Sequence, residues 1–207
     1  MFYKKPNLVF ILVMLTFTII VSSCGTSDED QPGSISTKGQ FLNLNKGSSW
    51  NYSLNGSDTF TVVTASDTSK ASFNKVYTLF HNVYLGSVSR SYFTYRSGNY
   101  YSLVTNTPGV FDEVVYLKDS IELGKQWKSS VLIGGNPYLH EYEVIENNLS
   151  LTVKGVVFNN VVHVKLKVVS TGYSSDSYYA PKVGLIKSFE IISGNSFLSE
   201  IRGYSLK

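Results

Sequence analysis

Large apolar side chains alternate with polar ones along short segments from Trp50 to the end of the chain. In the first segment Trp50, Tyr52 and Leu54 alternate with asparagine and serine, so an extended backbone would place all three on one face. The same region is dense in tyrosine, phenylalanine, valine, threonine and serine, and it shows no convincing helical period. The sequence therefore predicts an all-β fold.

The loop at residues 55–57 fixes how the first two predicted strands would pair. It reads Asn-Gly-Ser, and three residues is the simplest odd length that keeps the large side chains of both strands on one face. In that register Phe60 lies across from Tyr52, and Val62 lies across from Trp50. The two strands then form an antiparallel hairpin with one apolar face.

Three further loops extend the hairpin pattern. Ser-Gly-Asn at 97–99 and again at 193–195 predicts two more three-residue loops. Asparagines at 147–148 predict a two-residue loop that places Glu141 opposite Lys154. Consecutive hairpins form a mainly antiparallel meander, which we expect to curl into a barrel or half-barrel.

The expected β domain contains about a dozen strands. The serine-rich stretch around Ser174 is interpreted as a loop. The predicted strands lie near residues 50–54, 58–64, 75–85, 89–96, 100–105, 111–117, 126–132, 138–146, 149–154, 160–170, 183–192 and 196–206.

The first 23 residues have the features of an export signal. Lys4 and Lys5 form a charged start, and the apolar run from Leu8 to Val21 is shorter than the roughly 18 residues that a membrane span needs. We therefore expect residues 1–23 to be a helical signal peptide that is removed from the mature protein.

Val21-Ser22-Ser23-Cys24 resembles the lipobox of bacterial lipoproteins, which has an aliphatic residue, two small residues and an obligatory cysteine. The resemblance implies cleavage before Cys24 and acylation of its thiol, which would anchor the protein to a membrane. The alternatives are a buried thiol and an uncleaved signal anchor. Against them, Cys24 is the only cysteine and cannot form an intramolecular disulfide, and its place just after the apolar run suits processing.

Residues 24–40 comprise the expected lipidated cysteine and a flexible tether. Ile35 is the only large apolar residue after the cysteine, so this stretch cannot bury enough surface to fold. The acidic residues 28–30 resemble the signal that sends lipoproteins of some Gram-negative bacteria to the cell surface, and Gly25 resembles the sorting pattern that favours the outer membrane. An ordinary acidic linker would instead leave the protein facing the periplasm.

Residues 41–207 are long enough to form a single domain with its own core. Lys4 and Lys5 leave with the signal, so the mature chain keeps 16 of the 18 basic residues against 15 acidic ones. It lacks the clustered lysines and arginines of a phosphate-binding surface, so nucleic acid is not an expected partner. The sequence indicates no oligomeric state.

Two segments of this domain carry a second resemblance. Gly47 to Tyr52 has a Gly-x-x-Trp-x-Tyr pattern, and Tyr178 to Lys187 reads YYAPKVGLIK. Both resemble segments of uncharacterised bacterial lipoproteins and secreted β proteins, some of which are similar to the lipoprotein-carrier half-barrels that hold acyl chains. The resemblance implies binding of an apolar ligand. The second segment equally suits a structural corner or a ligand gate.

The sequence offers no catalytic or metal-binding pattern. His81, His140 and His163 stand alone, and no Gly-x-Ser-x-Gly motif supplies a nucleophile. We interpret His140 as a core residue and expect His163 on the solvent side. Glu141 and Glu143 would lie about 7 Å apart on one strand face, near the separation in inverting glycosidases, but a lysine across the hairpin would explain one of them. We therefore expect a non-catalytic protein without cofactor or metal.

The abundance of aromatic residues leaves two interpretations of function. The first is a carrier whose curved sheet encloses an apolar cavity for a lipid-like ligand. The second is surface adhesion or glycan contact through exposed rings. The expected cavity residues are Trp50, Tyr52, Phe60, Val62 and Tyr142. The expected exposed rings lie near Tyr92, Tyr100 and Tyr178.

Overall fold

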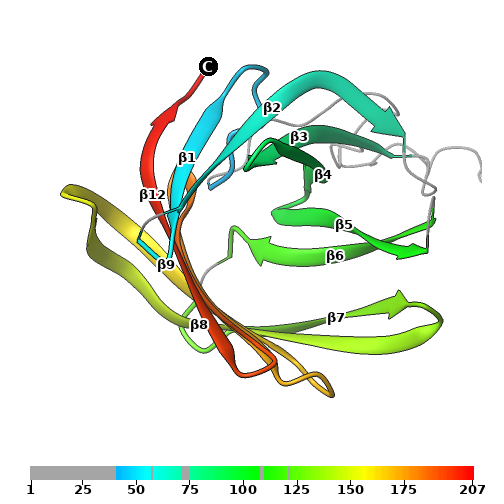
Figure 1. Ribbon diagram of the computed structural model, residues 1–207. Helices are drawn as coiled ribbons and strands as arrows, with labels where there is room; N and C mark the ends of the chain where they lie inside the picture. Colours follow the sequence, from blue (N-terminus) through cyan, green and yellow to red (C-terminus); the bar gives the residue numbers. More distant parts are fainter. Residues whose placement is uncertain (1–40, 57, 71–74, 108–109, 121) are drawn as a thin grey trace, which may run out of the picture. The chain divides into compact units, whose positions relative to one another are not determined.

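The computed structural model describes residues 41–56, 58–70, 75–107, 110–120 and 122–207 (Figure 1). The expected signal peptide, the lipidated Cys24 and the tether lie outside these residues. Within them, no helix could cross a membrane. The described strands form one antiparallel sheet, which confirms the all-β prediction. They are β1 (Ser49–Leu54), β2 (Asp58–Lys70), β3 (Val76–Tyr84), β4 (Ser87–Arg96), β5 (Asn99–Thr107), β6 (Val110–Lys118), β7 (Gln126–Ile133), β8 (Asn136–Val153), β9 (Val156–Val168), β10 (Tyr173–Ala180), β11 (Gly184–Ile192) and β12 (Asn195–Ser205).

The sheet curls into a nearly closed barrel with a seam between β6 and β7 (Figure 1). Each strand pairs with its sequence neighbours except at this seam, and β1 pairs with β12. Across the seam, Trp127 Nε1 donates to Val115 O at 2.9 Å, and Val115 N donates to Ser129 Oγ at 3.2 Å. Leu132 N donates to an Asp112 carboxylate oxygen at 2.5 Å. Hydrogen bonds from side chains thus pair some of the backbone groups at the facing edges of β6 and β7, which no strand ladder pairs.

The first hairpin has the predicted register. Trp50 pairs with Val62, Tyr52 pairs with Phe60, and Leu54 pairs with Asp58. The alternation of apolar residues was sufficient here because both strands bury the same face.

Two other loops were predicted one residue too long. Arg96 pairs with Asn99, and Ile192 pairs with Asn195, so Ser-Gly alone forms each turn. The serine and glycine have positive φ in both, 46° and 75° at 97–98 and 49° and 81° at 193–194. Two consecutive residues with positive φ form the tight turn that matches the twist of a hairpin.

The predicted turn at 147–148 is wrong. β8 continues through these residues, and irregular pairing with β9 between Val144 and Leu151 absorbs the extra residues as bulges. The chain turns instead at Lys154 and the glycine that follows, with φ of 48° and 83°. Lys154 is therefore far from its expected partner, and Glu141 pairs with Lys167 on β9.

β10 was missed, because residues 173–180 were interpreted as part of a loop and a turn. Ser175 and Ser177 occupy alternate positions of this strand and line the barrel interior. Polar residues on the inward face hide the usual apolar alternation of a strand. One strand missed here and one β8 strand counted as two leave the predicted number of strands unchanged.

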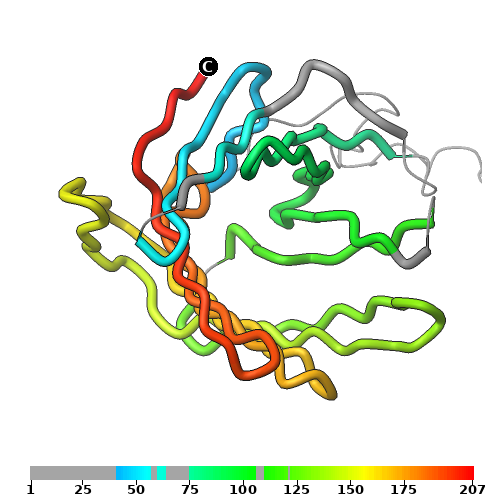
Figure 2. The backbone as a smooth tube through the Cα atoms, in the orientation of Figure 1, coloured from blue at the N-terminus to red at the C-terminus, as the bar shows by residue number. Residues whose placement is uncertain are grey.

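Residues 41–48 run into the barrel from the start of β1. At the outer end, Asn45 Nδ2 donates to Lys207 O at 2.6 Å, and Lys207 N donates to Ser48 Oγ at 3.0 Å. Figure 2 shows this blue segment and the red C-terminus on the same side of the sheet. At the inner end, Phe41 is fully buried. The first described residue therefore lies inside the domain rather than on its surface.

Candidate ligand-binding cavity

The interior of the barrel contains a partly open apolar cavity of about 370 Å³. This volume falls at the lower end of the roughly 300–1,000 Å³ that is usual for small-molecule sites. Four of the five predicted cavity residues, Trp50, Tyr52, Phe60 and Val62, line it together. The remaining lining residues are Phe41, Leu42, Phe80, Asn82, Phe93, Ser102, Tyr116, Leu117, Tyr179, Val183, Gly184 and Leu185. No charged side chain is among them.

Stacked rings form one wall of the cavity. Tyr52 stacks on Phe60 with centroids 4.9 Å apart, and Trp50 stacks on Phe80 at 5.8 Å. Phe93 meets Phe80 edge to face at 4.9 Å. This arrangement holds each ring by its neighbour, so the wall is formed before any ligand enters.

The polar atoms of Trp50 and Tyr52 bond to backbone carbonyls at the start of β11. Trp50 Nε1 donates to Val183 O at 2.7 Å, and the Tyr52 hydroxyl donates to Leu185 O at 2.8 Å. Burial raises the pKa of the Tyr52 hydroxyl above its ordinary value, so this group stays neutral. The segment that resembles the lipoprotein motif is therefore a fixed corner that also lines the cavity.

The N-terminal segment closes one end of the cavity through Phe41. Phe41 N donates to the Tyr100 hydroxyl at 2.7 Å, and the Tyr100 hydroxyl donates to Asp119 at 2.5 Å. Tyr95 donates to the same carboxylate at 2.5 Å. Burial and the bond to Asp119 raise the pKa of Tyr100, which therefore remains a donor. One sequence signal could have indicated this closure, namely the apolar pair Phe41-Leu42 directly after the polar tether.

Gly184 lies against this segment at the start of β11. A Cβ at this position would lie 3.5 Å from both Leu42 Cδ1 and Phe41 O, which is ordinary van der Waals contact, so a side chain would not clash there. Its φ of 92° is a backbone conformation that L-residues rarely adopt, and it is this conformation that favours glycine at the corner.

Tyr142, the fifth predicted cavity residue, does not line the apolar cavity. Its ring stacks on Trp127 with centroids 5.2 Å apart and an interplanar angle of 1°. Tyr142 belongs to a second core cluster and lines a neighbouring chamber of about 200 Å³. It thus lies inside the barrel as expected, but in a different compartment.

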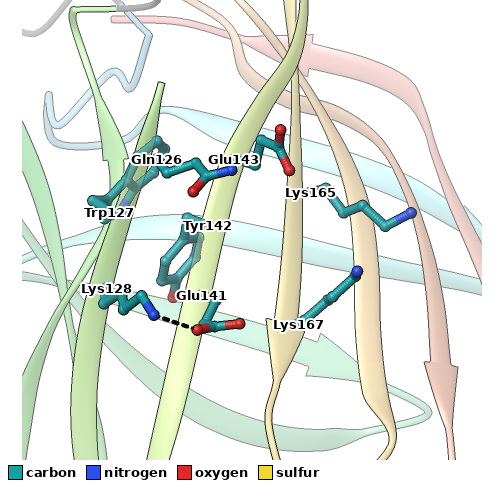
Figure 3. Close-up of a pocket in the computed structure, with 8 residues that line it drawn as sticks. All are labelled: Gln126, Trp127, Lys128, Glu141, Tyr142, Glu143, Lys165 and Lys167. Carbon is teal, nitrogen blue, oxygen red and sulfur yellow. Dashed lines mark hydrogen bonds and ion pairs between the residues drawn. The ribbon is translucent and has the colours of Figure 1, made fainter. Parts of the chain in front are cut away.

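A third hollow lies on the outer face of β7, β8 and β9 and contains the carboxylate pair (Figure 3). Lys128 Nζ contacts Glu141 at 2.6 Å, and Lys167 pairs with Glu141 across the β8–β9 ladder. Glu143 pairs with Lys165 in the next row. Both carboxylates thus belong to a cross-strand ladder of opposite charges, which accounts for them without catalysis. Lys154 instead pairs with Glu200, at 2.9 Å.

The expected row of exposed rings does not form. Tyr100 is fully buried, which contradicts its place in that row. Tyr92 packs edge to face on Phe111 at 5.8 Å, and Tyr178 stacks on His163 at 4.4 Å. The three rings are therefore occupied by different neighbours.

The histidines also differ from expectation. His163 is 7% exposed rather than solvated, and its nitrogens lie 3.2 Å from Glu146 and 2.8 Å from Asp176. His140 is half-buried beside Tyr142, and burial lowers its pKa. Among the described residues, no three histidine, cysteine or acidic side chains come together as a metal site.

Comparison with known proteins gives a likeness of fold alone. No family model matches the sequence, and no curated protein matches it significantly. A candidate exported protein with a YmcC-like fold from Bacteroides fragilis aligns with a TM-score of 0.51 and 10% identity, covering 81% of this chain and 99% of the other. A candidate lipoprotein from Parabacteroides distasonis aligns with a TM-score of 0.47 and 9% identity, covering 81% and 100%. The likeness to the Bacteroides fragilis protein shows that the barrel occurs in another bacterial protein.

Proposed function

We propose that the protein is a lipoprotein of the bacterial outer membrane, anchored through acylated Cys24 and displayed at the cell surface, whose β domain binds or carries an apolar ligand. The apolar cavity is the observation that supports binding of an apolar ligand. Its rings face an uncharged space while the polar atoms of Trp50 and Tyr52 are bonded elsewhere. Aromatic and aliphatic side chains predominate among the described lining residues, so apolar contact is the main interaction that the cavity offers a ligand.

The lipid anchor rests on the lipobox resemblance, and export agrees with the exported Bacteroides fragilis protein of similar fold. The cavity and the anchor suit each other, because an anchored domain meets lipids and other apolar molecules at the membrane. The domain needs no catalytic group for this role, and we propose a non-catalytic function without cofactor.

Filling the cavity is expected to weaken the binding of an apolar probe. Val62→Phe adds a ring to the lining, so N-phenyl-1-naphthylamine should bind at least about tenfold more weakly, by the ordinary cost of overpacking an apolar site. Probe fluorescence in a titration gives the affinity. Because the probe is neutral, binding to the wild-type domain should not change with salt.

Val88→Phe is the matched control, since Val88 is 61% exposed on β4 and does not line the cavity. Thermal melting of both variants checks that the domain remains folded. Equal probe binding by folded Val62→Phe and wild-type domains would refute the cavity as the binding site.

Cell-surface display is expected to depend on the acidic residues of the tether. Replacing Asp28, Glu29 and Asp30 with alanine should leave lipidation and the fold intact but protect the domain from protease added to whole cells. Immunoblotting after protease treatment measures this protection. If the wild-type protein is already protected in intact cells, the domain faces the periplasm and the acidic residues are a linker.

A further inference from the structure

The smaller chamber beside the apolar cavity has a polar wall built from β10 and β11. Ser175 pairs with Glu190, and Ser177 pairs with Ser188, so these four side chains are cross-strand neighbours on the inner face. Tyr173 also lines the chamber. A closed β interior is normally filled with apolar side chains, so a wall of this composition calls for a polar occupant.

The two compartments adjoin. Tyr116, Tyr179 and Leu185 line both of them. A single elongated molecule could therefore place one part among the rings of the apolar cavity and another part against the serines. The interior of the barrel is amphipathic along its length rather than apolar throughout.

Within the part of the chain that the structure describes, Glu190 is the only charged side chain that lines either compartment. Its carboxylate accepts weak hydrogen bonds from the Tyr173 hydroxyl and from Ser188 Oγ, both at 3.3 Å. Among the described residues no lysine, arginine or histidine forms an ion pair with it, although the chamber half-buries its side chain. Burial, followed by the charge of Glu190, raises the pKa of Tyr173 to about 12, so the tyrosine remains a neutral donor.

We infer that the ligand is amphipathic, with its apolar tail in the ring-lined cavity and a hydrogen-bond-donating, non-anionic head group beside Glu190. This inference rests on the proposed function and names the ligand class. An ammonium or hydroxyl head group would supply the strong partner that the carboxylate lacks. A carboxylate or phosphate head group would place two negative charges together in a poorly solvated chamber.

The test compares head groups on one tail. Dodecylamine, monolauroylglycerol and laurate differ in charge and donors but share a similar alkyl chain, and calorimetry below their micelle concentrations gives each affinity. The wild-type domain should bind the amine and the glyceride about tenfold or more tightly than laurate, as for a hydrogen bond to a charged group. Glu190→Gln should lower the affinity for the amine by a similar factor and raise the affinity for laurate. The affinity for N-phenyl-1-naphthylamine should not change.

Glu143→Gln is the matched control, because it removes a carboxylate from the outer face rather than from the chamber. It should leave all four affinities as in the wild type. If Glu190→Gln leaves the ratio of amine to laurate affinity unchanged while the naphthylamine still binds, the head-group inference is wrong and the apolar-ligand proposal stands. If neither the naphthylamine nor any lauryl compound binds the wild-type domain, both are wrong.

Discussion

Cys24→Ala is expected to move the protein from the membrane fraction to the soluble fraction. Each buried methylene of an acyl chain contributes about 0.8 kcal/mol, and two or more chains together make attachment effectively permanent. The variant loses every chain at once, because the thiol is the proposed site of acylation. Fractionation with immunoblotting measures the change, and the β domain itself should melt at the same temperature.

Ser23→Ala is the control for this experiment, since alanine keeps a small residue before the cysteine and should preserve processing. Mass spectrometry of the wild-type N-terminus should find an acylated cysteine as the first residue. An unmodified cysteine, or a mature chain that still begins at Met1, would contradict the proposed anchor.

The sequence-based prediction was most accurate for the first hairpin, where each strand buries only one of its faces. Trp50 and Tyr52 alternate with polar residues, and Phe60 and Val62 repeat the pattern after a short loop, so one register alone buries all four. These four predicted cavity residues line the cavity together for the same reason. Tyr142 also points inward, but alternation gives only the face of a strand and not the compartment.

Other errors arose where the interior is polar. On β11, Glu190 lines the inner chamber, whereas its neighbour Phe189 is 39% exposed. Counting apolar residues on such a strand predicts that the outer face points into the barrel. Ser175 and Ser177 hid β10 in the same way. The polar chamber could not be predicted from the sequence, because its wall exists only when β10 and β11 pair.

Closure of the cavity by Phe41 is a long-range effect that local pattern does not encode. Phe41 reaches Tyr100, 59 residues later, and Asp119 completes the hydrogen-bonded chain. The apolar pair Phe41-Leu42 at the start of the domain was not predicted to be buried, and nothing near it in the sequence indicates Tyr100 as its partner. Similarly, the seam between β6 and β7 depends on side chains such as Trp127, whose bond to Val115 replaces a strand ladder.

Trp50→Ala is expected to cost the domain about 3–5 kcal/mol of stability, the usual range for removing a buried tryptophan. Trp50 is 2% exposed, stacks on Phe80, and holds the corner at Val183 through its indole nitrogen. For a domain of this size the loss corresponds to a fall of roughly 6–20 °C in melting temperature. Thermal unfolding followed by circular dichroism measures it.

Two variants separate the contributions of Trp50. Trp50→Phe keeps a ring on Phe80 but leaves the Val183 carbonyl without its donor, which should cost about 1–3 kcal/mol. Phe189→Ala truncates an exposed ring and should change stability by about 0.5 kcal/mol or less.

Stability and probe binding together show what Trp50 does. Because the ring both supports the corner before β11 and lines the cavity, Trp50→Ala should lower the melting temperature and probe affinity together. Val62→Phe should lower probe affinity by filling space while the supporting bonds remain. A Trp50→Ala domain that loses the probe but melts within a few degrees of the wild type would show that Trp50 lines an open cavity without supporting the fold. A large loss of stability with unchanged probe affinity in the remaining folded protein would instead remove Trp50 from the binding site.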